Sequence, residues 1–279
     1  LLEEKPDFLV VYGDTNSTLA GALAAVKLHI PVAHVEAGLR SFNRKMPEEH
    51  NRVVADHCAD LLFCPTQTAV DNLAREGVTN GVYLVGDTMY DAVLQFSSIA
   101  RKRSTILEEL GLESQTYLLT TIHRPYNTDI PENLRNIFQA FAEIGEIIVF
   151  PAHPRTSKKI AALESSFSQE LVPGNIKIIE PVGYLDMLVL EENARLILTD
   201  SGGMQKEAYI FGVPCITLRP ETEWLETVEV GWNVLAGADT SAIVGGYQKA
   251  INSPPANRPN MYGDGAASLE VVRHRIEVF

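Results

Sequence analysis

The chain has 279 residues, a formal net charge of −13 and a pI of about 5.0. Hydrophobic residues make up 46% and charged residues 21%, a balance typical of a folded globular protein with room for one large or two medium α/β domains. The acidic balance argues against nucleic acid and against an anionic membrane as partners.

The first third of the chain alternates apolar runs with helical stretches. Strands are expected at residues 7–12, 30–35, 61–64 and 82–85, and helices at residues 19–27 and 66–75 and from Pro47 onward. This alternation predicts a mainly parallel sheet that is covered on both faces. Because the chain enters a strand soon after Leu1, a doubly wound domain starting there would lack its first units, and we expect an N-terminal truncation.

Residues 89–115 are predicted to be helical and polar, and the alternation then restarts. Strands are expected at residues 117–121, 146–150, 176–179, 196–198 and 215–218, helices at 131–141 and 184–193, and a final helix at 266–278 after a breaker-rich link at 253–260. We therefore predict an α/β protein with two doubly wound Rossmann-like domains and a cleft between them. The first domain comprises residues 1–88 completed by the C-terminal helix 263–279, and the second comprises residues 89–262.

The turn after the strand at 196–198 has the composition of an anion site. Ser201 and the glycines Gly202 and Gly203 open a helix whose free N–H groups and positive dipole end point at the turn, and phosphate is the usual occupant of such a site. Glu207 lies about one turn into the helix, where a carboxylate can reach the hydroxyls of a sugar. A capped turn with no ligand is the alternative interpretation.

Acidic residues gather at the strand ends of the first domain. Asp14 follows the first strand, and taken alone it is interpreted as a helix N-cap. Glu36 ends the next strand before a glycine turn, where burying a carboxylate without a role is costly. Glu48 and Glu49 lie in the first turn of a helix and could simply complement its dipole, Glu49 above all. Acids gathered in a cleft allow acid–base chemistry near neutral pH.

Basic residues follow the strands of the second domain. His123 and Arg124 stand at one strand end, as suits a phosphate-binding edge, and His153 and Arg155 repeat the arrangement after the next strand. Arg219 is a further candidate anion contact. These residue types predict a nucleotide-sugar or sugar-phosphate site, and they leave glycosyl transfer, elimination and epimerisation open.

In combination and in this order, the motifs resemble the non-hydrolysing UDP-N-acetylglucosamine 2-epimerase family, which has the GT-B fold. The matching stretches are GDT at 13–15, HVEAGLR at 34–40, PEEHNR at 47–52, HR at 123–124, LTDSGGMQKEA at 198–208 and YGDG at 262–265. The resemblance covers nearly the whole chain. It implies that UDP-GlcNAc is converted to UDP-ManNAc without a redox cofactor or a metal, by elimination of UDP to 2-acetamidoglucal and re-addition of UDP.

The resemblance also implies roles for individual residues. The family's catalytic acids match Asp14, Glu36 and Glu48, and its catalytic histidine matches His123. We expect Asp14 and Glu48 to handle proton transfer at C2, Glu36 to lie close to the sugar ring, and His123 to stabilise the leaving diphosphate. Residues 89–262 would then form the UDP-binding domain.

The resemblance assigns the remaining contacts to the UDP moiety. Ser201, Gly202 and Gly203 would hold phosphate, Glu207 the ribose, and Met187 would line the uracil pocket, although ordinary core packing is the alternative for this methionine. The resemblance further implies a homodimer. Three scattered cysteines show neither a disulfide nor a zinc pattern, and they indicate a reducing compartment such as the cytoplasm: Cys58, Cys64 and Cys215.

The chain departs from the family pattern at several positions. The family's opening Gly-Thr-Arg-Pro-Glu segment is absent, and Trp224 stands where bacterial members commonly have an arginine. Residues 125–127 differ from the usual pattern as well. The alternatives are therefore a related UDP-diacetamido-uronate 2-epimerase, a GT-B glycosyltransferase and an inactive fragment that binds a UDP-sugar.

Overall fold

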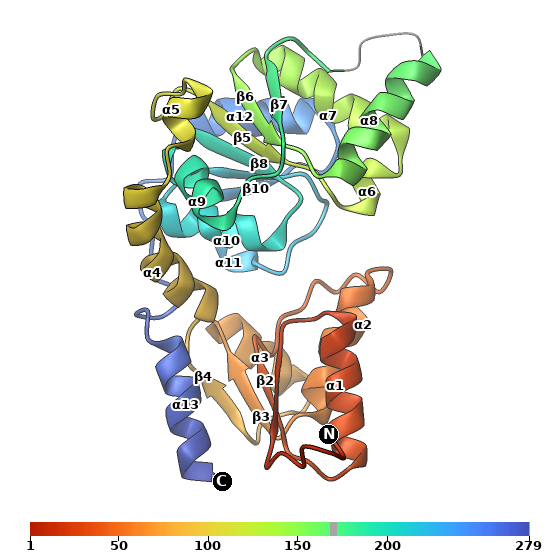
Figure 1. Ribbon diagram of the computed structural model, residues 1–279, viewed down its shortest axis with the longest axis vertical. Helices are drawn as coiled ribbons and strands as arrows, with labels where there is room; N and C mark the ends of the chain where they lie inside the picture. The colour runs from red at the N-terminus through yellow and green to blue at the C-terminus, as the bar shows by residue number, and fades with distance from the viewer. Residues whose placement is uncertain (168–171, 279) are drawn as a thin grey trace. The chain divides into compact units, whose positions relative to one another are not determined.

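A computed structural model describes residues 1–167 and 172–278 and divides the chain into two compact units (Figure 1). Unit 1 comprises Leu1–Leu94 and Pro259–Phe279, and unit 2 comprises Gln95–Arg258. The sequence analysis placed the two boundaries after residues 88 and 262. Within the described residues, no helix is long and apolar enough to cross a membrane.

Unit 1 contains a four-stranded parallel sheet in the order β1-β2-β3-β4. Its strands are β1 (Leu9–Tyr12), β2 (Val32–Val35), β3 (Leu61–Cys64) and β4 (Val82–Leu84). Its helices are α1 (Asn16–Lys27), α2 (Pro47–Cys58), α3 (Gln67–Arg75), α13 (Ala267–Val278) and the start of α4 (Thr88–Arg103), which continues into unit 2. All four predicted strands of this unit are confirmed, and β3 has the predicted bounds.

Helices cover both faces of the unit 1 sheet. Helices α1 and α2 run along one face, and α13 lies along the other (Figure 1). Small residues such as Ala22, Ala25 and Ala55 let the first pair pack closely on the sheet. On the opposite face the ring of His274 in α13 stacks on Tyr83, with 4.3 Å between the ring centroids. The C-terminal segment thus completes the core of unit 1.

Unit 2 contains a six-stranded parallel sheet in the order β10-β9-β8-β5-β6-β7. Its strands are β5 (Leu118–Thr121), β6 (Ile148–Pro151), β7 (Ile176–Ile179), β8 (Leu196–Thr199), β9 (Cys215–Thr217) and β10 (Asn233–Leu235). This is the strand order of a Rossmann fold, and the chain direction across the sheet reverses between β5 and β8. Ligands of such sheets bind beyond the carboxyl ends of the strands at this switch point.

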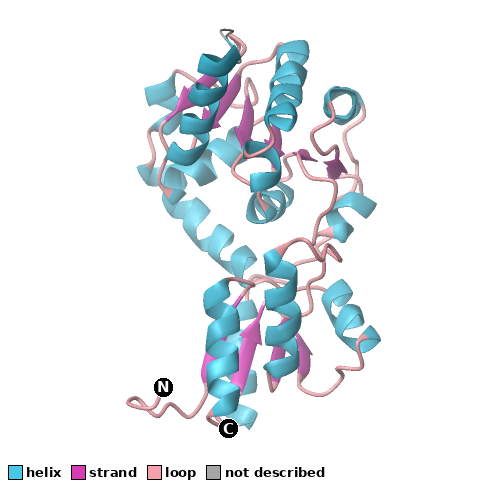
Figure 2. Cartoon of the chain, turned by 90° about the vertical axis from the view of Figure 1, so that its right-hand side faces the viewer, coloured by secondary structure: helices cyan, strands magenta, loops and turns pink. Residues whose placement is uncertain are grey.

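Helices flank the unit 2 sheet as well (Figure 2). They are α5 (Ile106–Leu110), α6 (Pro125–Thr128), α7 (Pro131–Ile144), α8 (Pro154–Phe167), α9 (Tyr184–Asn193), α10 (Gly202–Phe211), α11 (Leu225–Glu229) and α12 (Thr240–Asn252). The sequence analysis did not predict β10, α6, α8, α11 or α12. Helix α12 contains two glycines, and a Cβ atom on Gly246 would lie only 3.3 Å from Val234, so close packing rather than helix propensity explains this residue.

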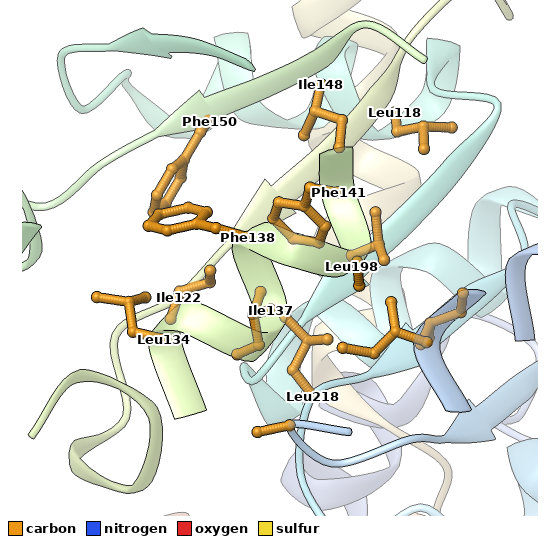
Figure 3. Close-up of a cluster of buried hydrophobic side chains, with 14 of the residues drawn as sticks. Leu118, Ile122, Leu134, Ile137, Phe138, Phe141, Ile148, Phe150, Leu198 and Leu218 are labelled. Carbon is orange, nitrogen blue, oxygen red and sulfur yellow. The ribbon is translucent and has the colours of Figure 1, made fainter. Parts of the chain in front are cut away.

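The core of unit 2 forms between its sheet and α7 (Figure 3). Phe138 and Phe141 of this helix are fully buried against Phe150, Ile148 and Leu118 of the sheet. The rings of Phe138 and Phe141 meet edge to face with 6.1 Å between their centroids. Side chains from β5, β6 and β8 converge on this helix, and the core therefore fixes the strands whose ends carry the candidate site.

Replacing Phe141 by Ala should test how much this core contributes to stability. We expect Phe141→Ala to lower the free energy of unfolding by about 3–5 kcal/mol, because a fully buried ring leaves a cavity that the sheet cannot fill. The measurement is urea unfolding followed by circular dichroism. Ile147→Ala, at a half-exposed position of the same unit, is the control, and a loss of similar size in both variants would contradict the prediction.

Candidate active site

The three candidate acids of unit 1 lie at one edge of its sheet. Asp14 follows β1, Glu36 follows β2 directly, and Glu48 lies in the first turn of α2. All three side chains are half-buried. Carboxylates at such an edge remain accessible to a ligand while the strands fix their backbone.

Asp14 does not cap α1, which corrects the interpretation of this residue taken alone. The N-cap is Thr15, whose side chain accepts a hydrogen bond from the N–H of Thr18 at 3.3 Å. The carboxylate of Asp14 instead accepts a hydrogen bond from the guanidinium of Arg52 in α2. Arg52 was not singled out from the sequence, because the contact joins residues 38 positions apart.

Glu49 does more than complement the dipole of α2. This buried side chain accepts hydrogen bonds from the backbone N–H groups of Ser41 and Phe42, both at 2.9 Å. It also pairs with Arg52 at 2.8 Å. Because Arg52 contacts Asp14 as well, this glutamate ties the loop after residue 40 to a candidate catalytic acid.

Glu36 has a strained backbone. Its φ angle of 71° lies in the left-handed region, which few residues other than glycine adopt. The N–H groups of Glu36 and Ala37 both donate to the carbonyl of Phe63 at 3.1 Å. Two residues on, a Cβ atom on Gly38 would lie 2.4 Å from the carbonyl oxygen of Ala69, so only glycine fits there. Strain of this kind costs about 1–3 kcal/mol and is concentrated at functional sites.

In unit 2 a buried aspartate organises the end of β5. Asp200, just beyond β8, accepts hydrogen bonds from the backbone N–H groups of His123 at 3.0 Å and Arg124 at 2.9 Å, and from the amide of Asn127 at 3.0 Å. The His123 ring nitrogen Nδ1 lies 3.1 Å from the same carboxylate. Burial raises the pKa of Asp200, but these contacts, led by the hydrogen bond to His123, lower it by more than burial raises it. The pKa of Asp200 is therefore lowered overall. Asp200 is thus an ionised anchor at the switch point.

Ser201 caps α10 by accepting a hydrogen bond from the N–H of Met204 at 3.4 Å. A Cβ atom on Gly202 would lie 3.6 Å from the indole nitrogen of Trp224 and 3.7 Å from a carboxylate oxygen of Glu223. Gly202 and Gly203 therefore bring bare backbone to the start of a ten-residue helix, beside an indole donor. This geometry suits an anion.

Arg219 and Met187 occupy different environments. The guanidinium of Arg219 is buried and forms a bidentate pair with Glu223, with contacts of 3.0 and 3.2 Å. Arg219 is thereby oriented by Glu223, and its contact with a ligand remains a prediction. Met187 is half-buried on α9, and Arg124 is half-buried at the N-terminus of α6.

Glu207 lies against a second acid that the sequence analysis did not identify. Glu191 of α9 is fully buried, and its carboxyl group faces that of Glu207. Burial, followed by the negative charge of Glu207, raises the pKa of Glu191 well above its ordinary value. The hydroxyl of Tyr184 faces both acids, and burial and then their charges raise its pKa. These causes favour the protonated, neutral form of Glu191.

A cavity of about 350 Å³ lies beside His123 in unit 2. Its lining includes His153 and Arg155, the second basic pair predicted from the sequence. The side chain of Arg155 is also held by Asp129 at 3.0 Å. Across residues 1–167 and 172–278, no group of three or more His, Cys, Asp and Glu side chains is arranged to hold a metal ion.

Two Rossmann-like units, with acids at the strand ends of one and a His–Asp pair at the switch point of the other, define a GT-B-like α/β enzyme. The family model described as UDP-N-acetylglucosamine 2-epimerase matches residues 1–274. The chain therefore belongs to the UDP-N-acetylglucosamine 2-epimerase family, and it is an enzyme of the isomerase class.

Individual relatives agree with this assignment. A Methanococcus maripaludis protein named UDP-N-acetylglucosamine 2-epimerase homolog is 52% identical, over 98% of this chain and 76% of that protein. The UDP-2,3-diacetamido-2,3-dideoxy-D-glucuronate 2-epimerase of Pseudomonas aeruginosa is 46% identical over the same shares. The crystal structure of Methanocaldococcus jannaschii UDP-GlcNAc 2-epimerase in complex with UDP-GlcNAc and UDP superposes with a TM-score of 0.92 at 48% identity, covering 99% of this chain and 77% of that one.

The protonated state of Glu191 predicts a pH-dependent stability. The unfolded chain ionises this residue above about pH 4.3, whereas the raised pKa in the folded unit favours the neutral form at higher pH. The residue therefore lowers the free energy of unfolding progressively as the pH rises from that value towards the raised pKa. We expect Glu191→Gln to match the wild type near pH 4 and to be the more stable of the two near pH 8.

Urea unfolding at the two pH values measures this difference. The control is Glu192→Gln on the same helix, where the wild-type side chain is paired with Arg101 on the surface. An identical pH dependence in the wild type and Glu191→Gln would show that Glu191 is not held protonated.

Proposed function

We propose that the protein interconverts UDP-GlcNAc and UDP-ManNAc by eliminating UDP across C1–C2 and adding it back. The observation that carries this proposal is the set of half-buried carboxylates at the carboxyl edge of the unit 1 sheet: Asp14, Glu36 and Glu48. Inversion at C2 requires a base that removes the proton and an acid that returns one to the opposite face, and paired carboxylates supply both.

In the first half-reaction one carboxylate removes the proton from C2. The electron pair of the C–H bond forms the C1=C2 double bond of 2-acetamidoglucal, and the electrons of the C1–O bond leave with UDP. Asp14 and Glu48 are the proposed proton carriers, and Glu36 lies close to the sugar ring. The guanidinium that contacts Asp14, from Arg52, orients that carboxylate. In the second half-reaction UDP adds back as the other face of C2 is protonated.

The leaving diphosphate gathers charge in the transition state, and that is where stabilisation accelerates the reaction. His123, oriented by Asp200, and the N-terminus of α10 at Ser201, Gly202 and Gly203 are the proposed donors. Arg124 and Arg219 add positive charge near the phosphates. Glu207 is proposed to bind the ribose, and Met187 to line the uracil pocket.

A UDP-sugar is thus the proposed small-molecule partner, and we further propose that the enzyme acts as a homodimer in the cytoplasm. Buried Cys64 and Cys215 are free thiols, which suits a reducing compartment. The acidic net charge of −13 gives no basis for a nucleic acid or an anionic membrane as a partner.

A diacetamido-uronic acid nucleotide is the second candidate substrate. It is supported by the 46% identity to the Pseudomonas aeruginosa enzyme. The cation–π pair of Lys206 and Trp224, with 4.1 Å between the ammonium and the ring centroid, supports it as well, because Trp224 stands where the resemblance expects an arginine. A different lining at the start of α10 would suit a different sugar.

Proton NMR in deuterated water tests the proposed reaction. Incubating the protein with UDP-GlcNAc is expected to give deuterium at C2 together with UDP-ManNAc signals, because the returned proton comes from solvent. The same assay with the diacetamido-uronate nucleotide tests the second candidate. UDP binding by calorimetry without exchange in either sugar would overturn both, and turnover that requires an acceptor would indicate a glycosyltransferase.

The isosteric variant Asp14→Asn tests the proposed proton carrier. We expect the C2 exchange rate to fall by about 10²–10⁴-fold, because an amide cannot remove the proton. The Kd for UDP is expected to stay within about threefold, because the change affects proton transfer in the transition state and leaves the binding of UDP in the ground state intact. Asp71→Asn, an exposed change on α3, is the control. An exchange rate close to that of the wild type would exclude Asp14 as a proton carrier.

A further inference from the structure

His34 is a fully buried histidine in the middle of the candidate site's framework, and the reaction does not use it. Its ring nitrogen Nδ1 lies 2.7 Å from Oδ1 of Asp56, and Nε2 lies 2.7 Å from the carbonyl oxygen of Gly13. Both nitrogens thus face acceptors. A neutral imidazole has only one N–H group, so only the doubly protonated ring satisfies both contacts.

One side of this arrangement controls the backbone that carries Asp14. The carbonyl group of Gly13 that accepts the His34 hydrogen bond belongs to the peptide unit leading into Asp14. Gly13 has a φ angle of 61°, and its N–H group donates to the carbonyl of Val35 at 3.1 Å. Strand β2 therefore contacts both the N–H and the carbonyl of Gly13 in the turn after β1. The contact to the carbonyl comes from the side chain of His34.

The other side controls the turn that carries Glu36. The second oxygen of Asp56, Oδ2, accepts hydrogen bonds from the N–H of Gly38 at 3.1 Å and from the guanidinium of Arg40 at 2.7 Å. Arg40 in turn donates to the carbonyl of Leu39 at 2.6 Å. One buried carboxylate thus fixes the residues that follow the strained backbone of Glu36.

A protonated His34 gives the buried carboxylate of Asp56 a second cation beside Arg40. His34 and Arg40 then face Asp56 and Glu76, and Glu76 receives two hydrogen bonds from Arg40 at 2.7 and 2.8 Å. Arg40 must otherwise serve both Asp56 and Glu76, so a charged ring at His34 gives Asp56 its own partner inside the unit. His57 lies 3.1 Å from Glu76 at the exposed end of the cluster.

The titratable groups around the ring favour the same state. Burial lowers the pKa of His34, but the hydrogen bond and charge of Asp56, the Gly13 carbonyl and the charge of Glu36 outweigh burial, and the pKa is raised. On β3, burial and the charge of Asp56, opposed by Arg40, raise the pKa of Cys64 to about 12, so this thiol stays neutral.

We propose that His34 and Asp56 form a positioning pair that holds the backbones of Asp14 and Glu36 in the geometry that C2 epimerisation requires. Neither member of the pair contacts the substrate. The inference rests on the proposed function, because it assigns these acids to the reaction. A displacement of about 1 Å at a reacting group can cost on the order of 10² in rate, and this is the effect that the pair prevents.

His34→Gln and Asp56→Asn test the pair, with the deuterium exchange assay as readout. We expect kcat to fall by about 10–100-fold in each variant, while KM and the Kd for UDP stay within about threefold. The matched control is Asp60→Asn, which removes a carboxylate that accepts the Val32 N–H at 2.8 Å at the opposite end of β2. Its kcat is expected to stay within about twofold of the wild type.

The ring's charge is measured independently by ¹⁵N NMR of histidine-labelled wild-type protein, with His34→Gln for assignment. At pH 7.5 we expect both ring nitrogens of His34 to carry protons, and the wild-type rate to fall as the pH rises through the raised pKa. The charged ring also contributes to the free energy of unfolding. This contribution is complete below about pH 6.5 and is lost as the pH rises above the raised pKa of His34.

Each outcome decides the inference. A wild type that exchanges C2 while both variants keep its kcat would overturn the positioning pair and leave the proposed function intact. A neutral His34 ring at pH 7.5 would also overturn the pair, even if a variant failed to fold. No exchange in the wild type would remove the proposed function and the inference with it.

Discussion

A fully buried aspartate in each unit fixes the turn that carries the candidate reactive groups. In unit 1, Asp56 accepts hydrogen bonds from His34, Arg40 and the N–H of Gly38. In unit 2, Asp200 accepts hydrogen bonds from two backbone N–H groups and from the amide of Asn127. An ionised carboxylate removed from water costs several kcal/mol unless such donors surround it. The requirement to satisfy this charge is what forces each turn into one conformation.

That constraint explains why a strained residue is tolerated at the end of β2. Glu36 adopts a left-handed backbone that costs about 1–3 kcal/mol. The contacts that over-determine the turn come from three elements, namely Asp56 of α2, the Phe63 carbonyl of β3 and the tight fit of Gly38 against Ala69 of α3. A turn held from three directions presents its side chain in one orientation, and a proton-transfer site requires this.

The sequence was sufficient to predict the parallel α/β class, the strands at 61–64 and 176–179, and the acids at strand ends, because these follow from local patterns. It was not sufficient for the partners of those acids. Arg52 and Asp56 lie on the buried side of α2, and their contacts join residues that are 38 and 22 positions apart. Nothing local distinguishes them from ordinary helix residues. The N-cap was misassigned by one residue, because Asp14 and Thr15 are both good caps and only packing decides between them.

Buried acids in this protein are accommodated in two ways, by surrounding donors or by a proton, and this bears on how an acidic protein can hold an anionic ligand. In unit 1, Asp56 is paired with Arg40 and Asp14 with Arg52, so cations from the turn after β2 and from α2 lie against these carboxylates. In unit 2, burial and the charge of the neighbouring Glu207 raise the pKa of Glu191, which favours its protonated form. A neutral Glu191 adds no second negative charge beside Glu207 of α10. The chain can therefore be strongly acidic overall while the start of α10 still favours phosphate.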